Sequence, residues 1–170
     1  MKTPSKKSAK DQTDRDGPTA PSLPLILETC ALLPQLGGDR AALHKAIAQG
    51  AQKILAGELA GVFTRHGDTL LETVVAEGEP GLRSALASHA KAFAAEAMEK
   101  NKPLDFKFSY KGGDEAGVYF GLAVPLVTPN LAAALLVLRT TAFSSVESSA
   151  LGTLGSVAKL VMEKTELAGV

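Results

Sequence analysis

The chain has 170 residues and a mass of 17.6 kDa, which is room for one domain and a tail but not for two hydrophobic cores. Apolar residues make up 45% of it, so most of the chain can form a core, while eighteen basic and eighteen acidic residues balance and argue against binding nucleic acid or anionic membranes through bulk charge. The single cysteine excludes an internal disulfide framework and a multi-cysteine metal site, and an aromatic fraction of 5% leaves few rings for stacking on bases.

Residues 1–21 are expected to form a disordered polar tail. They hold no large apolar residue after Met1 and so lack the apolar segment of a secretory signal. Five of the basic and three of the acidic residues lie in this stretch. The rest, residues 22–170, is therefore slightly acidic, and it is predicted to form a single domain.

Two helices and a hairpin are predicted next. Ser22 can cap a short helix to about Leu33, where Pro34 breaks it. Asp39 can cap a second helix, and Gly57 is placed to end that helix as a C-terminal glycine. The apolar runs 59–64 and 69–76, separated by Arg65-His66-Gly67-Asp68, then predict a strand, a tight turn and a strand.

A third helix is predicted over about 81–100, and Asn101 and Pro103 end it. Its inner stripe is predicted to consist of Leu82, Leu86, His89, Phe93 and Ala97. Weak alternation over 104–110 predicts a strand, and residues 111–115 read as a polar loop.

Two strands, 117–127 and 131–139, complete the predicted sheet. The uncharged stretch 116–138 is nominally long enough to cross a bilayer, but prolines and Asn130 interrupt it, so we interpret it as a buried hairpin with a turn at Thr128-Pro129-Asn130. Ser144 and Glu147 form a capping-box pattern that opens a last helix. The order predicts the α+β class, with an antiparallel five- to six-stranded sheet sandwiched between helices.

Over about 38–167 the chain resembles a GAF domain, the small-ligand sensor fold of phosphodiesterases, phytochromes and bacterial regulators, which is related to PAS domains. Three places carry the resemblance: the entry Ala46-Ile47-Ala48 with 54–63, the run Asn101-Lys102-Pro103-Leu104, and Leu122-Ala123-Val124-Pro125-Leu126 followed by 135–138 and Phe143-Ser144. The resemblance implies a GAF-like fold and a regulatory or sensory role.

Three activities of that family do not fit the residues. Asn101-Lys102, Phe143 and Glu147 look like fragments of the cyclic-nucleotide signature, but Ser148 stands where its acidic partner would be and the gap is too long. Bilin binders use a cysteine with a His-rich neighbourhood, which Cys30 lacks. The methionine sulfoxide reductases of the family work with several cysteines, and this chain has one.

No catalytic or metal site can be proposed from spacing. His44, His66 and His89 are scattered, without an Asp or Glu at metal-ligand spacing. Cys30 is interpreted as a small buried hydrophobe rather than a nucleophile. We therefore expect no enzymatic activity, no metal and no cofactor.

Strand parity predicts where a ligand pocket would lie. Along 117–127 the bulky residues alternate with Tyr119, Gly121 and Ala123, so one face should meet the second and last helices and the small face should meet the third helix. In GAF-like folds that small face holds the ligand, which makes the candidate lining residues Phe63 or Thr64, His89, Phe93, Phe106, Phe108, Tyr119 and Gly121. The alternative is that the Ala-rich third helix closes onto Gly121 and Ala123 and leaves no cavity.

The leading hypothesis is a cytoplasmic, non-enzymatic GAF-like regulatory or scaffold module, without a membrane span or nucleic-acid contact. It would act in trans through an unidentified protein partner, and as a homodimer that pairs the first and last helices. One alternative is a small-molecule sensor with a pocket between the sheet and the third helix. Another is a roadblock or longin-like adaptor for a small GTPase, which shares the helix and strand order.

Overall fold

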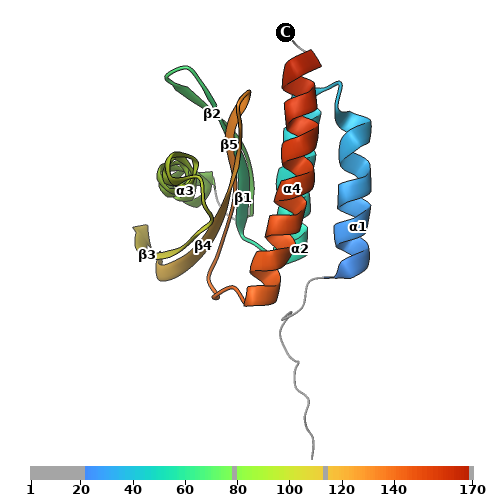
Figure 1. Cartoon of the computed structure of the whole chain (residues 1–170). Coiled ribbons are helices and arrows are strands. Elements are labelled where there is room, and N and C mark those ends of the chain that lie inside the picture. The colour runs from blue at the N-terminus through green and yellow to red at the C-terminus, as the bar shows by residue number, and fades with distance from the viewer. Residues whose placement is uncertain (1–21, 78–79, 113–114, 169–170) are drawn as a thin grey trace, which may run out of the picture.

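A five-stranded antiparallel sheet divides the molecule into two layers of helices. The computed structural model describes residues 22–77, 80–112 and 115–168, and the predicted tail lies outside them. The strand order is β2-β1-β5-β4-β3. Helices α1, α2 and α4 lie on one side of the sheet and α3 lies on the other (Figure 1). The predicted α+β sandwich is confirmed, with five strands.

The predicted order of elements is confirmed as well. The elements are α1 (Leu23–Leu32), the 3-10 helix η2 (Leu33–Leu36), α2 (Arg40–Leu55), β1 (Leu59–His66), β2 (Thr69–Ala76), α3 (Pro80–Lys100), β3 (Leu104–Gly112), β4 (Glu115–Thr128), β5 (Leu131–Arg139) and α4 (Ser145–Ala168). The sequence did not indicate η2. The predicted loop over 111–115 is shorter than expected, because β3 and β4 extend into it from both sides, and residues 113–114 lie outside the described residues.

Three helices start at the caps that the sequence indicated. The Ser22 hydroxyl and the Asp39 carboxylate each accept a backbone N–H from three residues further on, at 3.3 and 3.1 Å. At α4 the capping box is complete: the Glu147 N–H donates to Ser144 Oγ at 3.1 Å, and the Ser144 N–H donates to Glu147 Oε1 at 2.9 Å.

The end of α2 differs from the prediction. The left-handed residue after this helix is Ala56, with φ of 51°, and not Gly57. Gly57 is needed for a different reason, since a Cβ atom there would lie only 2.5 Å from Cγ1 of Val137. The glycine thus allows the chain to pass close to β5 as it enters β1.

Each face of the sheet has its own core. Leu122 and Leu126 of β4 belong to the core under α2 and α4, while Tyr119 and Ala123 belong to the core under α3. This alternation confirms the strand parity predicted from the sequence. The central strand β5 is buried along almost its whole length and contributes to both cores.

Helix α3 is rotated relative to the predicted stripe. Its buried residues are Leu86, Ala90, Ala94, Ala97 and Met98. His89, which was placed on the inner stripe, is exposed, so that assignment was wrong. The alanines let α3 lie close to the sheet, and this close approach turns the larger His89 and Phe93 toward the β3 edge, where their rings meet the aromatic side chains of that strand.

A buried ion pair joins β5, α2 and α4. Arg139, which is 6% exposed, binds both carboxylate oxygens of Glu147, at 2.8 and 2.6 Å, and it also donates to the carbonyl oxygens of Leu55, Thr141 and Ala142. Burial by itself would raise the pKa of Glu147, but hydrogen bonds from Arg139 and Ser144 lower it below its ordinary value. Glu147 is therefore charged and paired in the folded protein.

The uncharged stretch forms a hairpin, as predicted. β4 and β5 pair from Phe120 with Arg139 to Thr128 with Leu131, and the Asn130 N–H donates to Thr128 Oγ1 at 3.2 Å in the turn. Among the described residues, no helix has the length and apolar character needed to cross a membrane.

Candidate functional site

Most of the predicted pocket residues do meet, as an aromatic cluster at the β3 side of α3. Rings stack between His89 and Phe108, with centroids 4.6 Å apart, and between Phe93 and Phe106, at 3.7 Å. Tyr119 stacks on Phe108 from the neighbouring strand, at 6.0 Å. The residues thus form one continuous packed group beneath and beside α3.

The space left by Gly121 is filled by an aromatic ring. A Cβ atom at this position would collide with the ring of Phe106 and approach Cδ2 of Leu138 to 2.8 Å. The absence of a side chain at Gly121 therefore makes room for the ring of Phe106. In this cluster the small face of β4 is covered partly by α3 and partly by the Phe106 side chain.

The two remaining candidates lie on opposite faces of β1. Phe63 is fully buried in the core under α3, which is the side predicted for a ligand. Thr64 is also buried, but the next residue of a strand points to the other face. Of this pair, only Phe63 lies on the same side of the sheet as the aromatic cluster.

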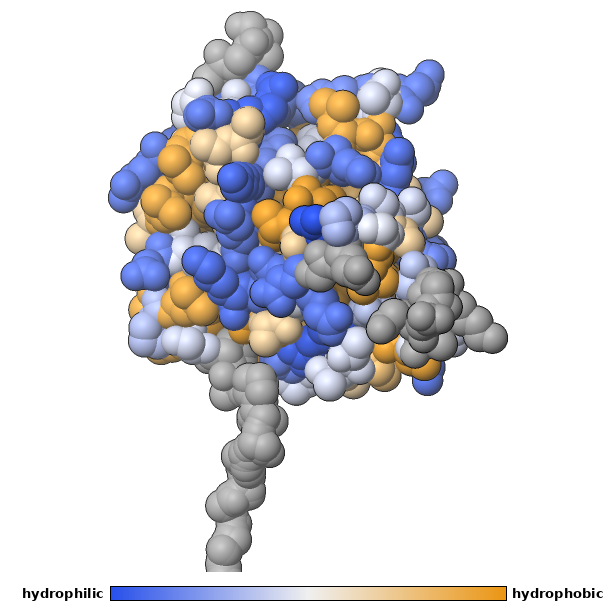
Figure 2. All heavy atoms as spheres, turned by 180° about the vertical axis from the view of Figure 1, so that it is seen from behind, coloured by the Kyte–Doolittle hydropathy of each residue, from blue (hydrophilic) through white to orange (hydrophobic). Residues whose placement is uncertain are grey.

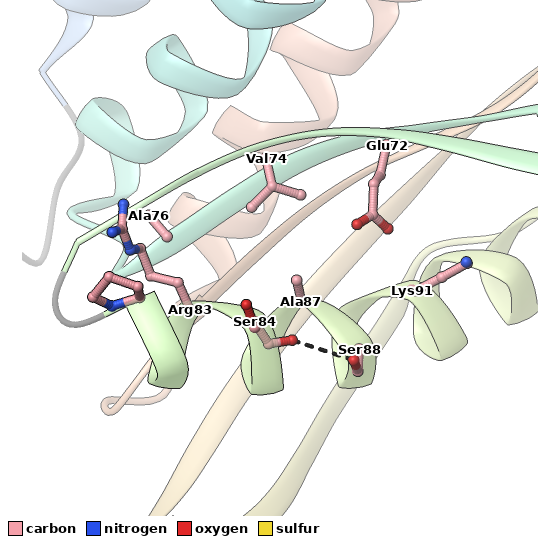
Figure 3. A pocket seen from close by; sticks show the side chains of 9 residues that line it. Glu72, Val74, Ala76, Arg83, Ser84, Ala87, Ser88 and Lys91 are labelled. Carbon is pink, nitrogen blue, oxygen red and sulfur yellow. Dashed lines mark hydrogen bonds between the residues drawn. The ribbon is translucent and has the colours of Figure 1, made fainter.

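An open cleft lies on the same side of the sheet but at the opposite edge, between β2 and α3 (Figure 3). Its volume is about 590 Å³, within the range of small-molecule sites. Its lining residues are Glu72, Val74, Ala76, Pro80, Arg83, Ser84, Ala87, Ser88 and Lys91.

Sequence periodicity explains why the cleft exists. The β2 residues that line it are two apart, and those of α3 recur at three- and four-residue steps, so each set lies on one face of its element. The facing residues Ala76, Ser84 and Ala87 are small. Because β2 is the edge strand, nothing in the sheet closes the space from that side.

The charges of the cleft are two positive and one negative. Arg83 and Lys91 come from α3, and Glu72 comes from β2 (Figure 3). The Nε atom of Arg83 is buried and has no hydrogen-bond partner among the described residues. The N-terminal end of α3, which begins at Pro80, adds the positive end of a helix dipole. The cleft therefore favours an anionic group.

Sequence reasoning missed this cleft. The prediction placed the ligand over the small face of β4. Strand parity shows which residues share a face of the sheet, but it does not show where a space remains between the sheet and a helix. The available signal was the charged and small row beside the inner stripe of α3, with Arg83, Ala87 and Lys91 at helical spacing.

Across residues 22–77, 80–112 and 115–168, no three His, Cys, Asp or Glu side chains are grouped to hold a metal ion. Cys30 is partly buried on α1, and burial raises the pKa of its thiol, which disfavours the reactive thiolate.

His44 makes folding sensitive to mild acid. Burial lowers its pKa below the ordinary value of 6.5; the Glu166 carboxylate opposes this shift, and the charges of Arg40 and His66 add to it. The unfolded chain therefore takes up a proton near pH 6.5 and the folded chain only at lower pH. We expect the free energy of unfolding to fall as the pH drops from 7.5 through 6.5 and further.

The His44→Gln variant should lose this part of the pH dependence. Urea denaturation at a series of pH values checks it, and an unchanged slope in the variant would contradict the assignment. The contribution of Glu147 is separate, because its lowered pKa places the loss of its charge below the ordinary glutamate range.

Known proteins resemble this chain in fold but not in sequence. No protein-family model matches the sequence, and neither does any curated protein. The fold, in contrast, matches many solved structures. A GAF domain from Pseudomonas syringae pv. tomato is 19% identical with a TM-score of 0.62, and the match covers 86% of this chain and 88% of that chain.

Two further structures agree. The GAF domain of a phosphoenolpyruvate-protein phosphotransferase from Acinetobacter is 14% identical, with a TM-score of 0.59 and coverage of 85% of this chain and 96% of that chain. The phycoerythrobilin-bound GAF domain of a cyanobacterial phytochrome is 10% identical, with a TM-score of 0.59 and coverage of 86% and 97%. These identities carry the fold and not the ligand. The agreement over most of both chains shows that this chain has the GAF-domain fold.

Proposed function

We propose that the protein is a non-enzymatic, cytoplasmic regulatory module that acts through protein–protein contacts, first of all with a second copy of itself through α1 and α4. The observation that carries this proposal is an apolar surface on these two helices. Leu23 and Leu27 of α1 are 63% and 61% exposed, and Leu160 of α4 is 66% exposed. Exposed leucines on helices that lie side by side are typical of an interface.

The same surface is almost free of charge. The exposed residues of α4 up to Leu160 are Ser145, Val146, Ser149, Thr153, Ser156 and Leu160, and α1 carries a single charged residue, Glu28. Figure 2 shows apolar side chains reaching the surface on the left of that view, where α1 lies. A two-fold axis brings identical surfaces together, so a surface without like charges can pair with itself.

Single charges on this surface should prevent pairing. Sedimentation velocity at concentrations on the order of tens of micromolar is expected to show a dimer for the unmodified chain, and a monomer for Leu27→Glu and for Leu160→Glu. Leu71→Glu is the matched control, since Leu71 is 51% exposed on β2, a strand that contacts neither α1 nor α4 among the described residues. A monomeric unmodified chain, or dimers in both interface variants, would contradict the proposal.

A second candidate function is small-molecule sensing in the β2–α3 cleft. Its volume supports this function, and so does the Nε atom of Arg83, which has no hydrogen-bond partner among the described residues. A ligand at about 100 times its Kd should stabilise the protein by about 2.7 kcal/mol, which a thermal-shift screen of nucleotides, amino acids and 2-oxo acids detects. The adaptor hypothesis is not proposed, because the fold matches point to GAF domains.

A further inference from the structure

The lining of the β2–α3 cleft restricts the chemical class of a ligand. Its nine lining residues include no aromatic side chain, so the cleft offers no ring on which a nucleobase could stack. They include three charged side chains, two positive and one negative. A complementary ligand therefore carries two negative groups and one positive group, and it is aliphatic.

The charged groups lie at the two ends of the cleft. Arg83 lies beside Ala76, whereas Glu72 and Lys91 lie toward the other end (Figure 3). Glu72 and Ala76 are four strand residues apart, or about 13 Å. Arg83 and Lys91 are eight helical residues apart, or about 12 Å along the axis. The backbone distance between the two ends of the cleft is therefore nearly the same along β2 and along α3.

These are backbone separations, and the charged groups of Arg83 and Lys91 stand at the ends of long, rotatable side chains, so they can reach a ligand shorter than the cleft. A short aliphatic chain with a carboxylate at one end and both an ammonium and a carboxylate group at the other matches the charges of the lining. Val74 and Ala87 line the middle of the cleft and give methyl and methylene contacts to such a chain (Figure 3).

We propose that the cleft binds an acidic α-amino acid, such as glutamate. Its side-chain carboxylate binds the Arg83 guanidinium, including the Nε–H that has no partner among the described residues. Its ammonium group binds the Glu72 carboxylate, and its α-carboxylate binds the Lys91 ammonium. The proposal rests on the sensing function of the cleft and names the ligand class for it.

Three probes that differ by one group test the assignment by titration calorimetry on the full chain. These are glutamate, glutarate, which lacks the ammonium group, and 4-aminobutyrate, which lacks the α-carboxylate. Glutamate is expected to bind most tightly, and each analogue about tenfold or more weakly. Absence of binding by glutamate up to about 1 mM, or equal binding of all three probes, would overturn the proposal.

Variants test two of the three contacts, those of Arg83 and Glu72. Arg83→Gln should weaken glutamate and glutarate alike by about tenfold or more. Glu72→Gln should weaken glutamate but not glutarate, because only glutamate has the ammonium group. Lys107→Gln is the control, since it removes the same charge from an exposed position on β3, at the far edge of the sheet. Unchanged glutamate binding in Arg83→Gln would overturn the assignment.

The two levels of the proposal fail differently. Suppose that glutamate stabilises neither protein, but that a nucleotide, a 2-oxo acid or a neutral amino acid stabilises the unmodified chain and not Arg83→Gln. The ligand class is then wrong, and the cleft remains a sensor site. If no compound of the screen acts on either protein, the sensing function fails together with the ligand class. Far-ultraviolet circular dichroism of each variant confirms that it is folded.

Discussion

Arg139→Met is expected to lower the free energy of unfolding by about 3–5 kcal/mol, the largest loss that we predict for one substitution. The change leaves the Glu147 carboxylate buried, at 3% exposure, without its counter-charge. It also removes the donor to three carbonyl oxygens, those of Leu55, Thr141 and Ala142. Desolvation is costly for a single buried charge, and here the ends of β5 and α2 and the start of α4 lose a common partner.

Denaturant unfolding monitored by circular dichroism measures the loss. Arg40→Met is the matched control, because the ion pair of Arg40 with Glu166 joins side chains that are 46% and 16% exposed and should contribute about 1 kcal/mol or less. In the double variant Arg139→Met/Glu147→Gln no isolated charge remains, so part of the stability should return. Equal stability of Arg139→Met and Arg40→Met would show that the buried pair is not what joins these elements.

Gly121→Val is expected to destabilise the fold by about 1–3 kcal/mol, because any side chain at this position meets the ring of Phe106. Displacing that ring also disturbs its stacking on Phe93, at 3.7 Å. Gly117→Val is a matched control on the same strand, where a Cβ atom has open space within 4 Å. Valine favours strands, so the control should be neutral or slightly stabilising.

A double-mutant cycle separates the steric cause from the loss of a glycine. In a Phe106→Leu background, which shortens the side chain over Gly121, the added cost of Gly121→Val should become smaller. The same cost in both backgrounds would mean that Phe106 is not the obstacle. Phe106 and the aromatic side chains around it would then pack differently from the arrangement described above.

The sequence predicted the order of elements because local chemistry determines it. Ser22, Asp39 and Ser144 each provide the cap that their helix uses, and alternation along β4 correctly assigned the two faces of the sheet. These signals require only neighbouring residues. They therefore survive in a single sequence without knowledge of the tertiary structure.

Other features depend on distances between elements. Helix α3 has alanine on several faces, so its pattern did not reveal that His89 would be exposed. The cleft at β2 depends on the distance between α3 and this edge strand. The hydrophobic periodicity of a sequence does not predict such a distance. Arg139 ends a strand, a position usually exposed, and its burial follows from its contacts with Leu55 of α2, which is 84 residues away along the chain, and with Glu147 of α4.

Native mass spectrometry of the gently purified chain tests the central claim, a regulatory module that pairs with itself, most directly. We predict a main species at twice the chain mass of 17.6 kDa that separates into single chains on denaturation. The Leu27→Glu variant should give the single-chain mass under the same conditions. A single-chain mass for the unmodified protein, at concentrations on the order of tens of micromolar, would contradict the claim.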